Sequence, residues 1–150
     1  MSTTAQTNSG SYGIGYADAA DPGNPAGLSS GQIELAYTLL GDANLDGAVN
    51  GSDFAILATN FNKAVSGWDQ GDFNYDGAAN GSDFALLASN FNKGASQAAI
   101  SGADAGSLNS FAIANGLQAD VPEPASAGLL TLGTIGMLVR RRRRTQAQAR

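Results

Sequence analysis

One stretch of 23 residues occurs twice in this chain of 150 residues. The first copy, from Gly41 to Lys63, reads GDANLDGAVNGSDFAILATNFNK, and the second, from Gly71 to Lys93, reads GDFNYDGAANGSDFALLASNFNK. The copies are identical at 18 aligned positions and are offset by 30 residues. Such a repeat predicts that one small structural unit is built twice and that the two units pack together.

Each copy places oxygen-bearing side chains at fixed offsets from its first Asp. Loop positions 1, 3, 5, 9 and 12 are Asp, Asn, Asp, Asn and Asp in both copies, and position 6 is Gly. Hard oxygen donors at alternating positions, a Gly at the sharp turn, a backbone carbonyl at position 7 and a closing carboxylate at position 12 form the ligand pattern of a calcium loop. We therefore predict two Ca²⁺ ions, one held by Asp42, Asn44, Asp46, Ala48, Asn50 and Asp53, the other by Asp72, Asn74, Asp76, Ala78, Asn80 and Asp83.

The residues after each loop have a helical pattern, whereas those before the first loop do not. Apolar side chains follow Asp53 at the i, i+3, i+4, i+7 spacing of a helix, and the same pattern follows Asp83. From Gln32 to Leu40, apolar and polar residues alternate instead, which predicts a strand. Each unit is therefore expected to be a loop with an exiting helix, without the entering helix of a full EF-hand. Because position 12 is Asp rather than the longer Glu, we expect calcium affinity in the extracellular range, roughly micromolar to millimolar.

Two loop–helix units in tandem, with D-x-N-x-D-G-x-x-N-x-x-D loops, resemble a type I dockerin module over about residues 41–94. The resemblance implies a mainly α fold, made of a pair of EF-hand-like calcium loop–helix units. With it we expect a short N-terminal β remnant and a C-terminal hydrophobic helix. The resemblance also implies a non-catalytic function, in which the helix pair docks onto a cohesin-like domain of a partner protein.

The recognition positions of that family are loop positions 10 and 11 and two positions along the helix. Carried over to this sequence, they imply partner contacts at Gly51, Ser52, Ala58, Thr59, Gly81, Ser82, Ala88 and Ser89. Gly at position 10 departs from the Ser/Thr-type pair of cellulosomal dockerins, which argues against an ordinary cellulosomal partner. The near-identity of the two copies would permit two binding modes related by a two-fold axis.

Composition excludes several kinds of active site. The chain has no Cys and no His, which removes disulfides, thiol nucleophiles, imidazole bases and the usual zinc sites. The clustered Asp residues could suggest a glycosidase acid and base. However, a bound ion would occupy those carboxylates, and a pair of loop–helix units offers no substrate cleft. We therefore expect no enzymatic activity in this chain.

The segments that flank the repeats have weaker patterns. Residues 1–40 contain one or two candidate strands with nothing to cover their apolar face, so we interpret them as the remnant of an upstream β-rich domain. Trp68, between the copies, is expected to be a hydrophobic plug, with a sugar-stacking platform as the alternative. Residues 95–120 are rich in Gly, Ala and Ser, which predicts a linker with a possible short helix around Leu108 to Leu117.

The C-terminal segment has three parts. Pro122, Glu123 and Pro124 precede an apolar run from 125 to 139, which is followed by Arg140, Arg141, Arg142, Arg143 and Arg144 and by a tail at 145–150. The apolar run is shorter than the ~17–25 residues of a typical spanning helix, although snorkelling arginines extend its effective length. We expect residues 125–139 to contact a membrane, with the C-terminus in the cytoplasm. An Arg tail that binds nucleic acid is the disfavoured alternative, and we expect no nucleic-acid partner.

This order over residues 121–144 is similar to the PEP-CTERM sorting signal of Gram-negative bacteria. The resemblance implies that an exosortase-type membrane protease-transpeptidase recognises the segment and cleaves near Pro122, Glu123 and Pro124. The protein is then expected to be exported to the cell envelope or surface, at least transiently anchored in the membrane. Two alternatives to cohesin docking remain: the C-terminal fragment of a polysaccharide-degrading enzyme, or a structural calcium clamp at the cell surface.

Overall fold

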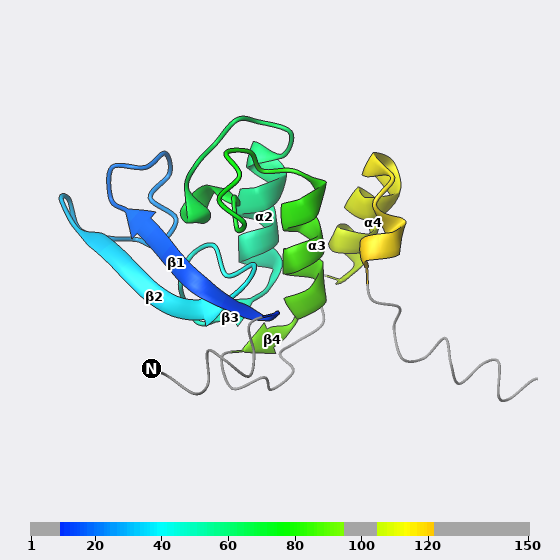
Figure 1. Cartoon of the computed structure of the whole chain (residues 1–150), viewed down its shortest axis with the longest axis horizontal. Coiled ribbons are helices and arrows are strands. Elements are labelled where there is room, and N and C mark those ends of the chain that lie inside the picture. Colours follow the sequence, from blue (N-terminus) through cyan, green and yellow to red (C-terminus); the bar gives the residue numbers. More distant parts are fainter. Residues whose placement is uncertain (1–9, 95–104, 122–150) are drawn as a thin grey trace, which may run out of the picture.

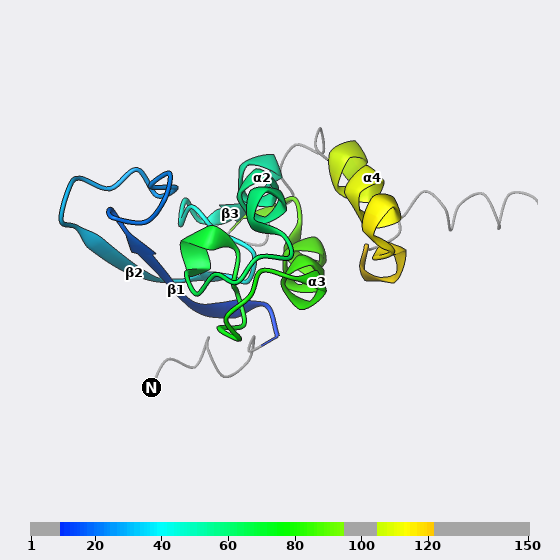
Figure 2. The same cartoon turned by 90° about the horizontal axis from the view of Figure 1, so that it is seen from above.

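The computed structural model describes residues 10–94 and 105–121. Its centre is a pair of helices of equal length, α2 (Gly51–Asn60) and α3 (Gly81–Asn90), which lie side by side (Figures 1 and 2). A β-hairpin flanks the pair on one side, and α4 (Ala105–Asn115) flanks it on the other. Both central helices follow a loop and end at an Asn, so the helical prediction for each copy is confirmed.

Both central helices begin with the same cap. The Asn50 side chain accepts a hydrogen bond from the backbone N–H of Ser52 (2.8 Å), and the Asp53 carboxylate accepts one from the backbone N–H of Asn50 (2.9 Å). Asn80 and Asp83 form the same reciprocal capping box at the start of α3. Loop positions 9 and 12 therefore satisfy backbone donors that a helix start leaves unpaired.

The hairpin consists of β1 (Tyr12–Asp18) and β2 (Ile33–Leu39), paired antiparallel. Its inner face lies against Trp68 in the short 3-10 helix η1 (Trp68–Gln70). A Cβ atom on Gly13 or Gly15 would approach the Trp68 ring to 2.9 Å. The ring therefore fits against the hairpin because these two positions have no side chain. Trp68 is 1% exposed, and the interpretation of it as a hydrophobic plug is confirmed.

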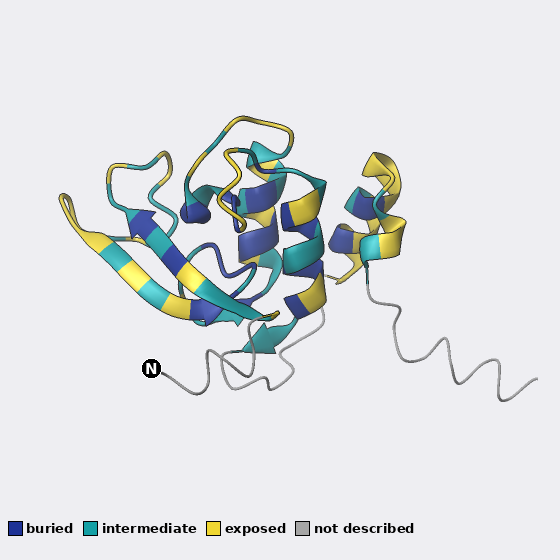
Figure 3. Cartoon of the chain, in the orientation of Figure 1, coloured by how far each residue is buried: buried dark blue, intermediate teal, exposed yellow. Residues whose placement is uncertain are grey.

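The outer face of the hairpin carries most of its large apolar side chains, and Leu39 at the end of β2 is the buried exception. Ile14, Ile33, Leu35 and Tyr37 are between 41% and 70% exposed. Figure 3 shows the resulting alternation of exposed and less exposed residues along β2. The apolar stripe faces solvent because the glycine-containing face is the one that receives Trp68.

The expectation of a mainly α fold with a C-terminal hydrophobic helix is wrong. The described residues form three short α-helices and two small antiparallel sheets. The reason is that the hairpin shares a core with the loops, through Trp68, and so contributes a layer to the same body. Within residues 10–94 and 105–121, no helix combines the length and the apolar character needed to cross a membrane. The hydrophobic segment 125–139 lies outside the described residues.

The second small sheet ties each helix to the opposite loop. β3 (Ala48–Val49), in the first loop, pairs with β4 (Lys93–Gly94), which follows α3. In the same way, Lys63 after α2 forms a bridge with Ala79 in the second loop. The two units are thus connected reciprocally, as expected for two copies of one unit packed face to face.

α4 lies within the stretch expected to be a linker, near the short helix considered there. It buries Leu108 and Ala112, and its Phe111 ring contacts Phe61, Phe54 and Phe84 at centroid distances of 4.9, 5.3 and 5.6 Å. The chain then turns through η2 (Gln118–Asp120). α4 is therefore a third packed helix of the same core, held by Leu108, Ala112 and the ring contacts of Phe111.

We expect Phe111→Ala to lower the free energy of unfolding by about 3 kcal/mol, because it leaves a cavity among three Phe rings. Ile113→Ala on the same helix is the matched control. Ile113 is 56% exposed, so its truncation should change stability by no more than about 0.5 kcal/mol. Urea unfolding followed by circular dichroism measures both. Equal effects of the two substitutions would contradict the packing of α4 on the helix pair.

Candidate metal centre

The first loop folds its polar side chains back onto its own backbone. The Asp42 carboxylate accepts hydrogen bonds from the backbone N–H of Gly47 (3.0 Å) and from the hydroxyl of Thr38. The side chains of Asn44 and Asp46 accept from the N–H groups two residues further on, at 3.1 and 2.9 Å. Asp53 closes the loop by accepting from Ala43 (2.9 Å). These contacts fix the carboxylates while leaving lone pairs on them, since a carboxylate offers about four acceptor sites.

The second loop has the same arrangement. Asp72 accepts from the backbone N–H of Gly77 (3.0 Å) and Asp83 accepts from that of Phe73 (2.8 Å). Each of the carboxylates of Asp72, Asp76 and Asp83 has an oxygen within 4.8 Å of those of the other two. Three converging hard anionic ligands suit a Ca²⁺ ion. The structure thus brings together the three acidic residues that the sequence assigned to the second ion.

Both loops bend at the same two places. Position 4 has positive φ although it is not Gly, with 59° at both Leu45 and Tyr75. Position 6 also has positive φ, 85° at Gly47 and 92° at Gly77. Only the glycines were evident from the sequence. A repeated left-handed residue with a large side chain costs about 1–3 kcal/mol and persists where the surroundings demand it.

Several carboxyl groups of the loops are buried. Burial raises the pKa of Asp53 to about 7 and also raises the pKa values of Asp42 and Asp83. By contrast, the hydrogen bond from the Asn74 amide to the exposed Asp76 lowers the pKa of that carboxylate. One oxygen of Asp42, Oδ1, is buried and has no hydrogen-bond partner. An orphaned buried carboxylate oxygen at loop position 1 fits a metal ligand, because a bound cation would supply the missing partner.

A comparison with protein-family models decides which family this loop–helix pair represents. The model of the dockerin type I domain matches residues 40–92. The chain therefore carries a dockerin domain. A second model, that of the PEP-CTERM protein-sorting motif, matches residues 120–144. Both resemblances noted in the sequence are confirmed, in the same order along the chain. No curated protein and no solved structure matches the chain significantly.

The sorting motif lies almost wholly outside the described residues, which end at Val121. Pro122, Glu123, Pro124 and the arginines 140–144 therefore have no structural description here. The match nevertheless marks the protein as one that is exported and associated with the cell envelope through exosortase-dependent sorting.

The positions predicted to contact a partner are not equally accessible in the two units. Two positions are exposed in each unit: Ser52 and Thr59 in the first, Ser82 and Ser89 in the second. Ala58 is half-buried, whereas its counterpart Ala88 is 2% exposed. A Cβ atom on Gly81 would lie 3.1 Å from Leu117, which follows α4. Packing by the segment that contains α4 thus removes part of the equivalence that the sequence repeat suggests.

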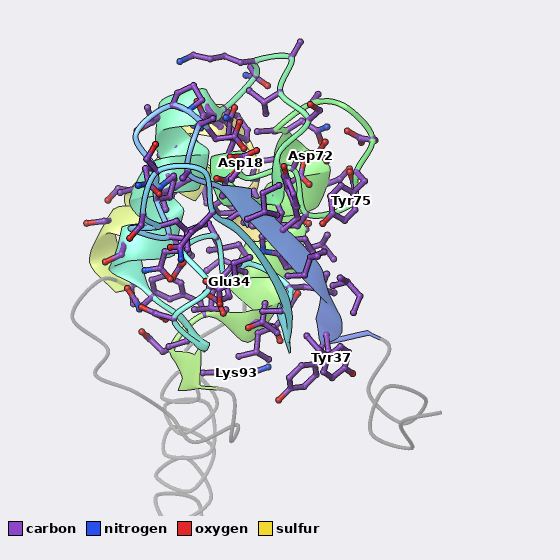
Figure 4. All side chains as sticks on the ribbon, turned by 90° about the vertical axis from the view of Figure 1, so that its left-hand side faces the viewer. Asp18, Glu34, Tyr37, Asp72, Tyr75 and Lys93 are labelled. Carbon is purple, nitrogen blue, oxygen red and sulfur yellow. The ribbon has the colours of Figure 1, made fainter. Side chains whose placement is uncertain are left out.

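Several hydrogen bonds that hold the dockerin domain together were not predicted from the sequence. Thr38 reaches from β2 to the Asp42 carboxylate, and the Tyr75 hydroxyl donates to the carbonyl of Ile14 in β1 (2.7 Å). Figure 4 shows Tyr75 and Asp72 at the same end of the hairpin, far from Tyr37. The Trp68 indole N–H donates to the Asp42 carbonyl at 2.6 Å. The hairpin and the plug therefore support the loops directly.

We expect Trp68→Phe to destabilise the protein by about 1–3 kcal/mol, because it leaves a buried carbonyl at Asp42 without its indole donor. Tyr75→Phe is the control, since it removes a hydroxyl from a side chain that is 51% exposed and should cost about 1 kcal/mol or less. Thermal unfolding in excess calcium compares the two. A larger loss for Tyr75→Phe would contradict the buried role of the indole N–H.

Proposed function

We propose that each loop of the dockerin domain binds one Ca²⁺ ion through the six residues predicted for it. Asp42, Asp46 and Asp53 supply the carboxylates of the first site, and Asp72, Asp76 and Asp83 those of the second. Asn44, Asn50, Asn74 and Asn80 supply side-chain oxygens, and Ala48 and Ala78 supply backbone carbonyls. The observation that carries this proposal is the convergence of the Asp72, Asp76 and Asp83 oxygens within 4.8 Å.

Calcium acts on folding through the helix starts. Asp53 and Asp83 serve both as closing ligands and as members of the capping boxes of α2 and α3. Without a cation, buried carboxylates repel one another and oppose the folded state. A cation that neutralises them therefore stabilises the loops, both helix starts and the packing of the helix pair together. Calcium binding thus contributes directly to the free energy of folding.

The domain docks onto a cohesin-like partner through the recognition positions of its helix pair. The first unit provides the more accessible set: Gly51, Ser52, Ala58 and Thr59. In the second unit, burial of Ala88 and the contact of Gly81 with Leu117 leave Ser82 and Ser89 as the exposed positions. This asymmetry favours one of the two binding modes that the repeat would permit.

The docking proposal is tested by calorimetric titration of a type I cohesin domain into the full chain. We expect binding in calcium and its loss in excess EDTA, because the docking face depends on the calcium-bound helix pair. If the first unit makes most of the partner contacts, Thr59→Arg should weaken binding more than Ser89→Arg. Absence of binding to cohesins of several sequence groups, in a chain that still binds calcium, would instead favour a structural calcium clamp at the cell surface.

The exposed face of the hairpin favours a second candidate function. Ile14, Ile33, Leu35 and Tyr37 form an apolar stripe that the described residues leave uncovered. Residues 1–40 would be the last strands of an upstream β-rich domain, for example of a polysaccharide-degrading enzyme, and the rest of that domain would cover this stripe. In that case the dockerin domain carries an enzyme to its partner, and catalysis lies upstream. This candidate would be excluded if the genomic sequence immediately upstream of this chain had no in-frame coding potential.

A further inference from the structure

One carboxylate outside both calcium loops is buried, that of Asp69. Asp69, in η1, is 0% exposed, and neither of its side-chain oxygens has a hydrogen-bond partner. Leaving a buried polar group unpaired costs about 1–3 kcal/mol, and more when the group is charged. An unpaired buried carboxylate therefore requires a counter-ion or a proton.

The charged group that acts most strongly on Asp69 is another carboxylate, that of Asp21. Burial, and next the negative charge of Asp21 and a contact with its carboxyl group, raise the pKa of Asp69 to about 7. Asp21 lies in the turn after β1, three residues beyond Asp18, which is labelled in Figure 4. Two carboxylates that face each other are both acceptors, so a shared proton or a cation must join them.

The surroundings of Asp69 provide room and further oxygen atoms. Asp69 borders a cavity of about 470 Å³ between the turn at 22–25 and α2, with Thr59 and Asn60 in its wall. The Thr59 hydroxyl donates to the Ala55 carbonyl (2.7 Å), which leaves its lone pairs available. The Asn60 amide nitrogen donates to the Gln70 carbonyl (2.9 Å), so its side-chain oxygen remains an acceptor.

No lysine competes for this position. The basic residues in the described parts of the chain are Lys63 and Lys93. Their ammonium groups donate to the backbone carbonyls of Thr59 and Ser89, both at 2.7 Å. The pair of Asp21 and Asp69 therefore has no charged partner among the described residues.

We propose that Asp69 and Asp21 form a third cation site, which takes a hard divalent ion of the calcium type between η1 and the turn after β1. Asn60 and Thr59 would complete the oxygen set with water, since Ca²⁺ takes 6–8 oxygen ligands. With only two carboxylates and an open cavity, the site should bind in the range of about 10⁻⁴ to 10⁻³ M. The ion would connect the hairpin to the segment between the repeats, whether or not the loops bind calcium.

Calcium chloride titration of the isotope-labelled full chain, followed by ¹H–¹⁵N NMR, separates the three sites. The amides of Gly47 and Gly77 report the loops, and those of Asp21 and Gln70 report the new site. We expect the second pair to shift with its own, weaker dissociation constant. Asp69→Asn should abolish that separate transition, while the Gly47 and Gly77 shifts remain as evidence that the variant is folded.

Asp120→Asn is the matched control, because Asp120 lies in η2, away from the loops and from Asp69. It should retain all three transitions. The proposal is overturned if the Asp21 and Gln70 amides follow the loop transitions in both the native chain and Asp69→Asn. That outcome would mean that the two carboxyl groups share a proton instead. Failure of the loops to bind would be recognised separately, from unshifted Gly47 and Gly77 amides.

Discussion

The double substitution Asp46→Ala, Asp76→Ala should abolish the stabilisation of the chain by calcium. Each change removes the charged ligand at loop position 5, and we expect it to weaken calcium binding about 100-fold per site. Native protein in calcium at 100 times the dissociation constant gains about 2.7 kcal/mol per site. Differential scanning calorimetry with and without EDTA should thus show a large calcium-dependent rise in Tm for the native chain and almost none for the variant.

Position 5 is the suitable place for this test because Asp46 is exposed and its contacts are local. It accepts hydrogen bonds from the Asn44 side chain and the Ala48 backbone. The unfolding temperature in EDTA should therefore change little. The isosteric pair Asp46→Asn, Asp76→Asn keeps an oxygen at each position and should retain part of the calcium response. A full calcium response in the Ala variant would contradict the ligand assignment.

Gly41→Ala should cost about 3 kcal/mol of stability, from backbone strain and overpacking together. Gly41 has a φ of 105°, and a Cβ atom there would lie 2.7 Å from the Cα of Leu87 in α3. Gly71, its counterpart, has a φ of 98° and lies against Leu57 in α2 in the same way. The residue before each loop is thus where one unit's loop touches the other unit's helix backbone.

For a domain of 60–100 residues, such a loss corresponds to a fall in Tm of about 12–24 °C. Gly116→Ala is the matched control, because Gly116 also has positive φ (73°) but has no neighbouring atom within 4 Å of the added Cβ. It should show the strain alone, about 1 kcal/mol. Equal losses at both positions would mean that the loop–helix contact at Gly41 is not tight.

The parts of the fold that repeat were predictable from the sequence, and the parts that do not repeat were less so. The capped helices follow from periodicity and from Asn and Asp at loop positions 9 and 12, because these are local effects. The role of the hairpin was missed because its inner face is made of Gly13, Gly15 and small side chains. A pattern search looks for large apolar residues on the buried side, and here most of them lie on the exposed side.

The candidate site divides in a similar way. Ligand spacing is a local property, so the Asp and Asn positions could be assigned from the chain alone. The supports of the site, Thr38 and the Trp68 indole, act over tertiary contacts that no spacing encodes. The burial of Asp69 and the covering of Ala88 likewise depend on how the turn after β1 and α4 pack, and neither segment belongs to the repeat.

The central claim is that calcium, bound by the two loops, stabilises the packed helix pair of the dockerin domain. Isothermal titration calorimetry of calcium chloride into the EDTA-treated full chain, with far-ultraviolet circular dichroism of the same samples, tests it most directly. We expect saturable binding by the loops, accompanied by a gain in helical signal. No heat of binding and an unchanged spectrum would contradict the claim, and would reduce the two repeats to turn-rich connecting segments.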